Sequence, residues 1–211
     1  MFDPQTNAFL ADLAANNSRD WFTQNRARYD TQYLAPAKAF ADAFAAQLER
    51  RSGAPVDTRL FRIHRDVRFA KDKTPYNTHV HIAWRNPGAA LWWMFGLEVD
   101  ALVIGFGCFG FGKDKLDHWR RLLDSSAGAE LQDILQGLTD AGLRIDPPSL
   151  KRVPAPFDKD HPRGVLLRHK ELAIWKDALP LAMANGDQAP AVLAEKMDVF
   201  EPLRRWFTAH F

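Results

Sequence analysis

The densest group of residues that could bind a ligand or take part in a reaction lies between Arg62 and His79, where charged side chains alternate with apolar ones. Five cations fall in this segment: Arg62, Arg65, Arg68, Lys71 and Lys73. The planar guanidinium group of arginine matches phosphate and carboxylate better than scattered ammonium groups do. The segment therefore predicts a cationic pocket, with Tyr76 and His79 also lining it. We expect its ligand to be anionic: a phosphorylated metabolite, a nucleotide or a nucleic-acid end.

Arg65 occupies an unusual position in this pattern. Alternation places it on one face of an expected strand with four apolar residues: Phe61, Ile63, Val67 and Phe69. An unpaired guanidinium group on such a face would be very costly, so Arg65 must meet an acid, backbone carbonyls or a ligand. Three acids are candidate internal partners: Asp66, Glu98 and Asp100. We favour an internal ion pair, and contact with a ligand stays open as the alternative.

The same region offers residues that ligate metals or transfer protons. Four of them suit zinc or a similar ion: His64, Asp66, His79 and His81. Arg62 and Arg68 would share their face and repel a cation, so we expect no metal, and no other cofactor is indicated. His79 and Asp66 are the candidate catalytic acid or base. The sequence does not decide whether the protein is an enzyme.

A glycine-rich run invites comparison with a nucleotide-binding loop. Residues 105–110 match G-x-G-x-x-G, but the parallel βαβ unit of a dinucleotide site does not follow. Glycines inside a strand instead allow an aromatic ring or another backbone to approach closely. Cys108 lies in this apolar run with no histidine nearby in sequence, which indicates a buried, inert thiol.

The N-terminal fifty residues have helical periodicity. Phe9, Leu10 and Leu13 mark the first helix, and Asn17 or Ser18 is expected to cap the second. A third helix begins near Pro36 and carries a continuous apolar stripe: Ala37, Phe40, Ala41, Phe44 and Leu48.

Between residues 58 and 112 the period changes to two, which predicts four strands joined as an antiparallel meander. The expected strands cover residues 61–69, 79–84, 91–99 and 101–111. Trp84, Trp92 and Trp93 are assigned to the core or a pocket wall and not to base stacking. Because Trp92 and Trp93 are adjacent, they must point to opposite faces, and one of them should be core.

Helices resume at Asp114 and over residues 129–139, and Val165–Leu167 is expected to form one short strand. Five prolines between residues 143 and 165 indicate an ordered loop or edge strand there. The chain after residue 167 reads as helical, with Pro202 kinking or ending the last helix. The whole pattern predicts a single α+β domain over residues 1–211, in which N-terminal and C-terminal helices flank the meander.

Composition excludes several classes of protein. The chain has 211 residues, is 46% hydrophobic and carries a net charge of +2, which argues against disorder and against polybasic nucleic-acid binding. One cysteine excludes an internal disulfide framework. The most apolar stretch, residues 89–112, contains Glu98 and Asp100, so we expect no membrane span. No signal-peptide pattern opens the chain, and a cytoplasmic location is expected. Oligomeric state is undetermined.

The segment from Arg62 to His79, Arg-Ile-x-Arg-Asp-x-Arg-Phe-x-Lys-Asp-Lys-x-Pro-Tyr-x-Thr-His, resembles the signature of the bacterial and fungal family called domain of unknown function 2461. The resemblance covers nearly the whole chain, including residues 16–22, 151–154 and 166–170. It implies a unit of this size but no mechanism and no catalytic residues. Three outlying cations in family-like blocks are expected to face the pocket: Arg120, Arg168 and Lys170. Asn77 and Lys113 depart from the family pattern.

Three hypotheses for function follow. The first is an enzyme acting on an anionic substrate, with a pH profile near neutrality if His79 is the acid or base. The second is a module without chemistry that binds a nucleic-acid backbone and weakens steeply with salt. The third is a structural network of Arg65, Asp66 and Asp72, whose loss would lower stability without any ligand.

Overall fold

The computed structural model describes residues 1–211, and the chain divides into two compact units. Unit 1 comprises Met1–Ala89, Trp93–Ile104 and Asp177–Lys196. Unit 2 comprises Ala90–Trp92, Gly105–Lys176 and Met197–Phe211. None of the helices is both long enough and apolar enough to cross a membrane.

Six strands form an antiparallel sheet in the order β1-β2-β3-β4-β6-β5. The strands are β1 (Asp57–Leu60), β2 (Val80–Arg85), β3 (Trp92–Leu97), β4 (Leu102–Cys108), β5 (Arg144–Ile145) and β6 (Leu172–Leu179). The α+β class and the antiparallel sheet expected from the sequence are confirmed. The consecutive order of β1 to β4 is the expected meander.

Five helical segments open unit 1, and the first two begin at side-chain caps. They are α1 (Pro4–Ala15), α2 (Arg19–Gln24), α3 (Arg26–Arg28), the π-helical η1 (Tyr29–Leu34) and α4 (Ala35–Ser52). Asp3 caps α1, and the Ser18 hydroxyl accepts the backbone N–H of Trp21 at the start of α2. Helix α4 ends at Gly53, whose φ of +69° is the left-handed conformation that favours glycine.

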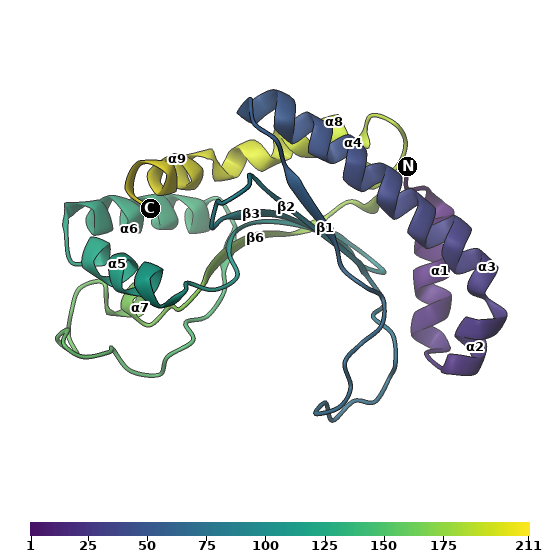
Figure 1. The fold of residues 1–211 in the computed structure, drawn as a ribbon, viewed down its shortest axis with the longest axis horizontal. Coiled ribbons are helices and arrows are strands. Elements are labelled where there is room, and N and C mark those ends of the chain that lie inside the picture. Colours follow the sequence, from purple (N-terminus) through teal and green to yellow (C-terminus); the bar gives the residue numbers. More distant parts are fainter. The chain divides into compact units, whose positions relative to one another are not determined.

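Helix α4 covers one face of the sheet in unit 1, beside α8 (Ala189–Lys196) (Figure 1). Its expected apolar stripe is buried throughout. The Phe44 ring lies 4.5 Å from Trp84, whose indole N–H donates to the carbonyl of Ala41 at 3.0 Å. Phe40 lies 4.7 Å from Phe95. Each large apolar side chain fully buried in this layer stabilises the fold by about 1.5–3 kcal/mol.

The other face of the sheet in unit 1 carries Arg59 of β1 and His81 of β2. In the strand register, Arg59 lies opposite Ala83, and His81 lies opposite Gly96. Since side chains alternate along a strand, Arg59 and His81 point away from α4. The long connection between β1 and β2 extends on this side of the sheet, below it in Figure 1.

Unit 2 contains α5 (Lys113–Leu123), α6 (Ser126–Asp140), α7 (Gly164–Leu167), η3 (Met197–Phe200) and α9 (Glu201–His210). Trp119 of α5 is fully buried, with Trp206 and Phe207 of α9 at ring distances of 6.3 and 6.0 Å. The 3-10 helix η2 (Leu181–Ala184) belongs to unit 1.

The glycines of β4 bring a neighbouring strand close, as the sequence predicts. A Cβ atom at Gly105 would lie 2.5 Å from the Trp175 ring, and one at Gly107 would lie 2.0 Å from the Leu172 carbonyl oxygen. These glycines therefore serve strand packing against β6, and no helix opens at the loop as a nucleotide cradle requires.

The strand expected over residues 61–69 is wrong. Strand β1 ends at Leu60, and Phe69 is 96% exposed instead of lying on an apolar face. The side chain of Asp66 accepts the backbone N–H of Arg68, and that of Asp72 accepts the N–H of Thr74. Such local side-chain bonds to the backbone compete with strand pairing and hold this segment as a loop.

Three expectations for the rest of the chain are also corrected. Val165–Leu167 lies in the helical turn α7, where the Leu167 N–H donates to Arg163, and the strand is β6, in a segment expected to be helical. Pro202 lies in the first turn of α9, a position that proline fits, and does not end a helix. Trp92 and Trp93 are both half-buried at the start of β3, so neither is the expected core residue, whereas Trp84 is fully buried.

Candidate functional site

The base of the 61–79 loop is closed by backbone hydrogen bonds. The N–H of Arg65 donates to the Pro75 carbonyl at 2.9 Å, and the N–H of Asn77 donates to the Ile63 carbonyl at 2.7 Å. Isolated pairing of His64 with Tyr76 continues this short ladder. Within the strand expected over residues 61–69, strand-like backbone pairs are thus confined to a few residues.

Asn17 anchors the loop to the N-terminal helices of unit 1. Its amide nitrogen donates to the Tyr76 carbonyl at 2.9 Å, and its amide oxygen accepts the Tyr76 N–H at 3.1 Å. The Tyr76 ring stacks on Phe22 with centroids 4.1 Å apart. The sequence suggested only a capping role for Asn17, but Ser18 takes that role alone.

Arg65 makes the internal ion pair that the sequence favoured, but its partner is Asp72, which the sequence named only in the structural-network hypothesis. Its Nη1 donates to Asp72 Oδ2 at 2.6 Å, to the Thr74 carbonyl at 3.1 Å and to the Thr74 hydroxyl. The expectation of Asp66, Glu98 or Asp100 as its partner is therefore wrong. That expectation placed Arg65 on the apolar face of a strand, whereas its side chain is 25% exposed in a loop. All three hydrogen bonds use Nη1, so the remaining guanidinium N–H groups stay available at the pocket.

The pKa of Asp72 reports on this arrangement. Hydrogen bonds from the Thr74 N–H, Arg65 and the Thr74 hydroxyl lower it from 3.8 to about 2. Because the folded-state pKa is depressed, the contribution of ionised Asp72 to loop stability is present above pH 4 or so and is lost as pH falls through about 2.

We expect the side-chain carboxyl carbon of Asp72 to titrate in NMR with a midpoint near pH 2. In Arg65→Met the midpoint should move part of the way towards 3.8, since the larger contribution of the Thr74 N–H remains. An ordinary midpoint in the wild-type protein would contradict the loop geometry.

A pocket of about 610 Å³ opens between the loop and the sheet of unit 1. Its lining consists of Arg59, Leu60, Phe61, Arg62, His64, Arg65, Asp66, Asn77, His79 and His81. Four of the residues singled out as ligand-binding or catalytic from the sequence are thereby brought together: Arg62, Arg65, Asp66 and His79. Arg59 was missed as a site residue, and His81 was considered only as a metal ligand, because their place in the pocket depends on the register of β1 and β2.

The other residues predicted from the same segment do not line this pocket. Arg68 pairs with Asp66 at 2.7 Å, and Lys73 Nζ donates to the Val67 carbonyl at 2.9 Å. Lys71 is exposed, and Tyr76 is buried against Phe22. Arg68 and Lys73 therefore stabilise the loop from within.

The three outlying cations belong to unit 2. Arg168 lines a different pocket of about 480 Å³, together with Lys151, Arg152 and Lys159. Lys170 is exposed, and its backbone N–H donates to Ser149. Arg120 lies on α5 with its Nε buried and without a hydrogen-bond partner.

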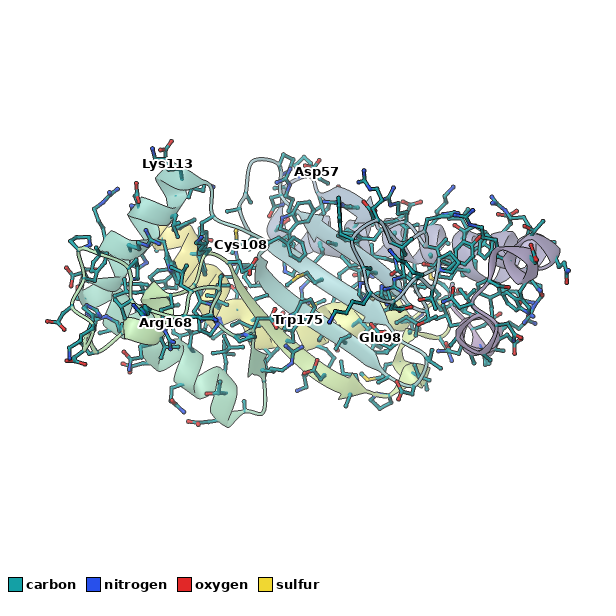
Figure 2. The ribbon with its side chains drawn as sticks, turned by 90° about the horizontal axis from the view of Figure 1, so that it is seen from below. Asp57, Glu98, Cys108, Lys113, Arg168 and Trp175 are labelled. Atoms are coloured by element: carbon teal, nitrogen blue, oxygen red, sulfur yellow. The ribbon has the colours of Figure 1, made fainter.

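Two histidines and a carboxylate meet at one side of the unit 1 pocket. The rings of His79 and His81 stack with centroids 3.6 Å apart. His81 Nε2 lies 2.9 Å from Glu98 Oε1, and His79 Nδ1 lies 3.7 Å from Glu98 Oε2. Figure 2 looks onto the sheet face opposite α4 and marks Glu98 there.

The electrostatics of this cluster keep His79 neutral and Glu98 ionised. Burial, together with His81 and Arg65, lowers the pKa of His79 to about 4 against the opposing effect of Glu98. Burial alone would raise the pKa of Glu98, but the hydrogen bond with His81 and the proximity of His79 lower it overall. Near neutral pH the cluster thus presents a carboxylate and a neutral His79 imidazole.

A model of the family described as conserved hypothetical protein (DUF2461) matches residues 5–206. The chain belongs to this family. The match includes the whole loop and all the pocket residues of this DUF2461 protein. No curated protein matches the sequence at a significant level.

Cys108 offers no additional chemistry in this DUF2461 chain. The thiol is buried, and burial raises its pKa. A thiolate is therefore disfavoured near neutral pH, as the sequence predicts for an inert cysteine. The residues of unit 1 that could bind a ligand or take part in a reaction are its arginines and the His79, His81 and Glu98 cluster.

Proposed function

We propose that the pocket of unit 1 binds a small phosphorylated or nucleotide-like anion. The observation that carries this proposal is that Arg59 and Arg62 line the pocket without a hydrogen bond or ion pair to any acid. A guanidinium group presented in this way has its donors free for the oxygens of phosphate or carboxylate.

The charge balance of the lining supports an anion. Three arginines face the pocket, and Asp66, the acid among the lining residues, is engaged by Arg68. That pairing lowers the pKa of Asp66, and the nearby charge of Arg62 adds a smaller effect in the same direction, so the negative charge of Asp66 is compensated mainly by Arg68. Asp72 similarly compensates Arg65 from outside the lining. The remaining positive charge comes from Arg59 and Arg62.

The size of the pocket favours a small ligand over an extended nucleic acid. Its volume of about 610 Å³ falls within the usual range for small-molecule sites, about 300–1,000 Å³. Nucleic-acid binding through the backbone draws on wider basic surfaces, whereas the net charge of the chain is only +2.

If the pocket is catalytic, neutral His79 suits the role of a base. With a pKa of about 4, its deprotonation falls in the acid range, so we place the corresponding limb of a pH–rate profile there and not near neutrality. Asp66 is held by Arg68, which favours a positioning role for this carboxylate over proton transfer.

We expect phosphate, pyrophosphate or a nucleotide to raise the thermal midpoint of the full-length protein. A ligand at about 100 times its dissociation constant adds about 2.7 kcal/mol to the free energy of unfolding. In Arg62→Met the affinity for the best anion should fall about tenfold or more, the usual range for a hydrogen bond to a charged group. Differential scanning fluorimetry at low salt measures both.

Arg50→Met provides the matched control, because Arg50 is exposed on α4 and does not line the pocket. It should respond to the anion like the wild type. A flat response to every anion, or an undiminished response in Arg62→Met, would contradict the proposal. Stabilisation by oligonucleotides alone, with a steep salt dependence, would favour a nucleic-acid backbone as the ligand.

A further inference from the structure

The His79, His81 and Glu98 cluster has the donor set of a metal centre. Two imidazoles and one carboxylate present one ligand atom each, and these atoms all lie within 4.8 Å of one another. Zinc and other first-row metals bind imidazole nitrogen and carboxylate oxygen at about 2.0–2.2 Å. Two such ligands at tetrahedral or octahedral angles are about 3.0–3.5 Å apart. The His–Glu separations of 2.9 and 3.7 Å bracket that spacing.

We infer that His79, His81 and Glu98 form a binding site for a divalent transition-metal ion, with Zn²⁺ or Fe²⁺ as the class of ion it would take. Three protein ligands leave positions open, as in catalytic zinc sites and two-histidine, one-carboxylate iron sites. His79 and His81 line the pocket that Arg59 and Arg62 also line, so the open positions are directed to the same cavity.

The backbone holds the three ligands in place independently of any ion. His81 lies opposite Gly96 in the β2–β3 pair, and a Cβ atom at Gly96 would lie 3.2 Å from the His81 ring. The glycine thus gives this ring space on the neighbouring strand to reach Glu98. The Tyr33 hydroxyl donates to the His79 carbonyl at 3.0 Å, and the Glu98 N–H donates to the Ala101 carbonyl at 2.9 Å.

The electrostatic objection to a metal loses one of its two arginines once residues 61–79 are known to form a loop, whereas Arg62 still lines the pocket. Arg68 points into an ion pair with Asp66 and does not line the pocket. Asp72 compensates Arg65, and Glu98 supplies a negative charge to the cluster itself. Glu98, which replaces His64 and Asp66 in the ligand set, directly follows β3 and lies outside the 62–79 segment from which the sequence-based ligand set was drawn.

The test is metal binding by the full-length protein after removal of metal with a chelator. In calorimetric titrations near neutral pH we expect one equivalent of Zn²⁺ or Co²⁺ to bind with a dissociation constant below about 10 µM, whereas Mg²⁺, which prefers oxygen ligands, binds far more weakly. Visible ligand-field bands of bound Co²⁺ should indicate nitrogen and oxygen ligands, and this measurement needs no variant.

Glu98→Gln and His81→Gln should each weaken Zn²⁺ binding about tenfold or more. His64→Gln is the control inside the pocket, and His161→Gln is the control for an isolated histidine–carboxylate pair, since His161 lies 3.1 Å from Asp124 in unit 2. Both should bind Zn²⁺ like the wild type. Circular dichroism melts establish that each variant is folded.

The inference is overturned if the wild-type protein binds neither ion more tightly than about 100 µM, or if folded Glu98→Gln and His81→Gln bind Zn²⁺ as the wild type does. The metal site does not require the proposed anion site, although both share one pocket, and a metal bound to His79 would replace the role of this residue as a free base. Zn²⁺ binding without any phosphate response would contradict only the proposed function. A phosphate response that persists in the presence of chelator, without Zn²⁺ binding, would contradict only the metal site.

Discussion

Gly107→Ala is expected to lower the free energy of unfolding by about 3 kcal/mol or more, or to prevent folding. The added methyl group would lie 2.0 Å from the Leu172 carbonyl oxygen and 2.7 Å from the Ala173 Cα atom. Both neighbours are backbone atoms of β6, so no side-chain rotation relieves the overlap. The strands β4 and β6 would have to separate, and the hydrogen bonds between them would weaken.

Gly137→Ala is the matched control. Gly137 lies in α6, and a Cβ atom there meets nothing within 4 Å. Alanine in an open helical position stabilises by about 0.5–1 kcal/mol relative to glycine. Urea unfolding followed by circular dichroism measures both changes. Equal stability of Gly107→Ala and the wild type would contradict the close packing of β4 on β6.

Local periodicity was sufficient to predict the parts of the fold whose partners are near in sequence. The stripe from Ala37 to Leu48 recurs at helical spacing, and all its members are buried in α4. Ser18 was one of two candidate caps of α2, and its hydroxyl makes the capping bond. These features depend on a few consecutive residues and on the geometry of one helix.

The loop shows where local periodicity misleads. Alternation from Phe61 to Phe69 is what a strand requires, but a strand also needs a partner for its backbone groups. Here Asp66 and Asp72 accept backbone N–H groups within the loop. Short-range hydrogen bonds of this kind depend on conformation and leave no distinctive pattern in the sequence. Some of the charged side chains that suggested a pocket instead stabilise the loop through hydrogen bonds within it.

The histidine cluster depended on register. His79 and His81 could be placed on one face of β2 from their spacing, but Glu98 could be assigned to them only once Gly96 was known to lie opposite His81. A shift of one residue in the β2–β3 pairing would turn Glu98 to the other face. From sequence alone Glu98 was one of three candidate partners for Arg65, and nothing in the spacing favoured the histidines.

Arg65→Met is expected to reduce the affinity for the best pocket anion about 10- to 100-fold, the effect of removing one charge-assisted hydrogen bond to a ligand. The thermal midpoint without ligand should change little. The partner left behind, Asp72, has a side chain that is 60% exposed, so water replaces Arg65 as its partner. The large penalty for an uncompensated buried charge does not apply to this pair.

Two further variants separate the charge of Arg65 from its position. Arg65→Lys keeps the charge but removes the planar fork, and Asp72→Asn keeps the arginine but weakens the contact that orients it. If position matters, Asp72→Asn should lower anion affinity even though it makes the pocket more positive. If charge alone matters, Asp72→Asn should bind the anion as tightly as the wild type or more tightly.

The measurement is paired for every variant: the thermal midpoint without ligand, and the affinity for the same anion by calorimetry. An Arg65→Met protein that melts early would indicate that the Asp72 and Thr74 contacts maintain the fold and not the site. A variant that melts and binds like the wild type would show that Arg65 has no part in anion binding. Since Nη1 alone is engaged by the loop, the proposed function gives Arg65 two roles: one end of the guanidinium fixes its position, and the other would meet the anion.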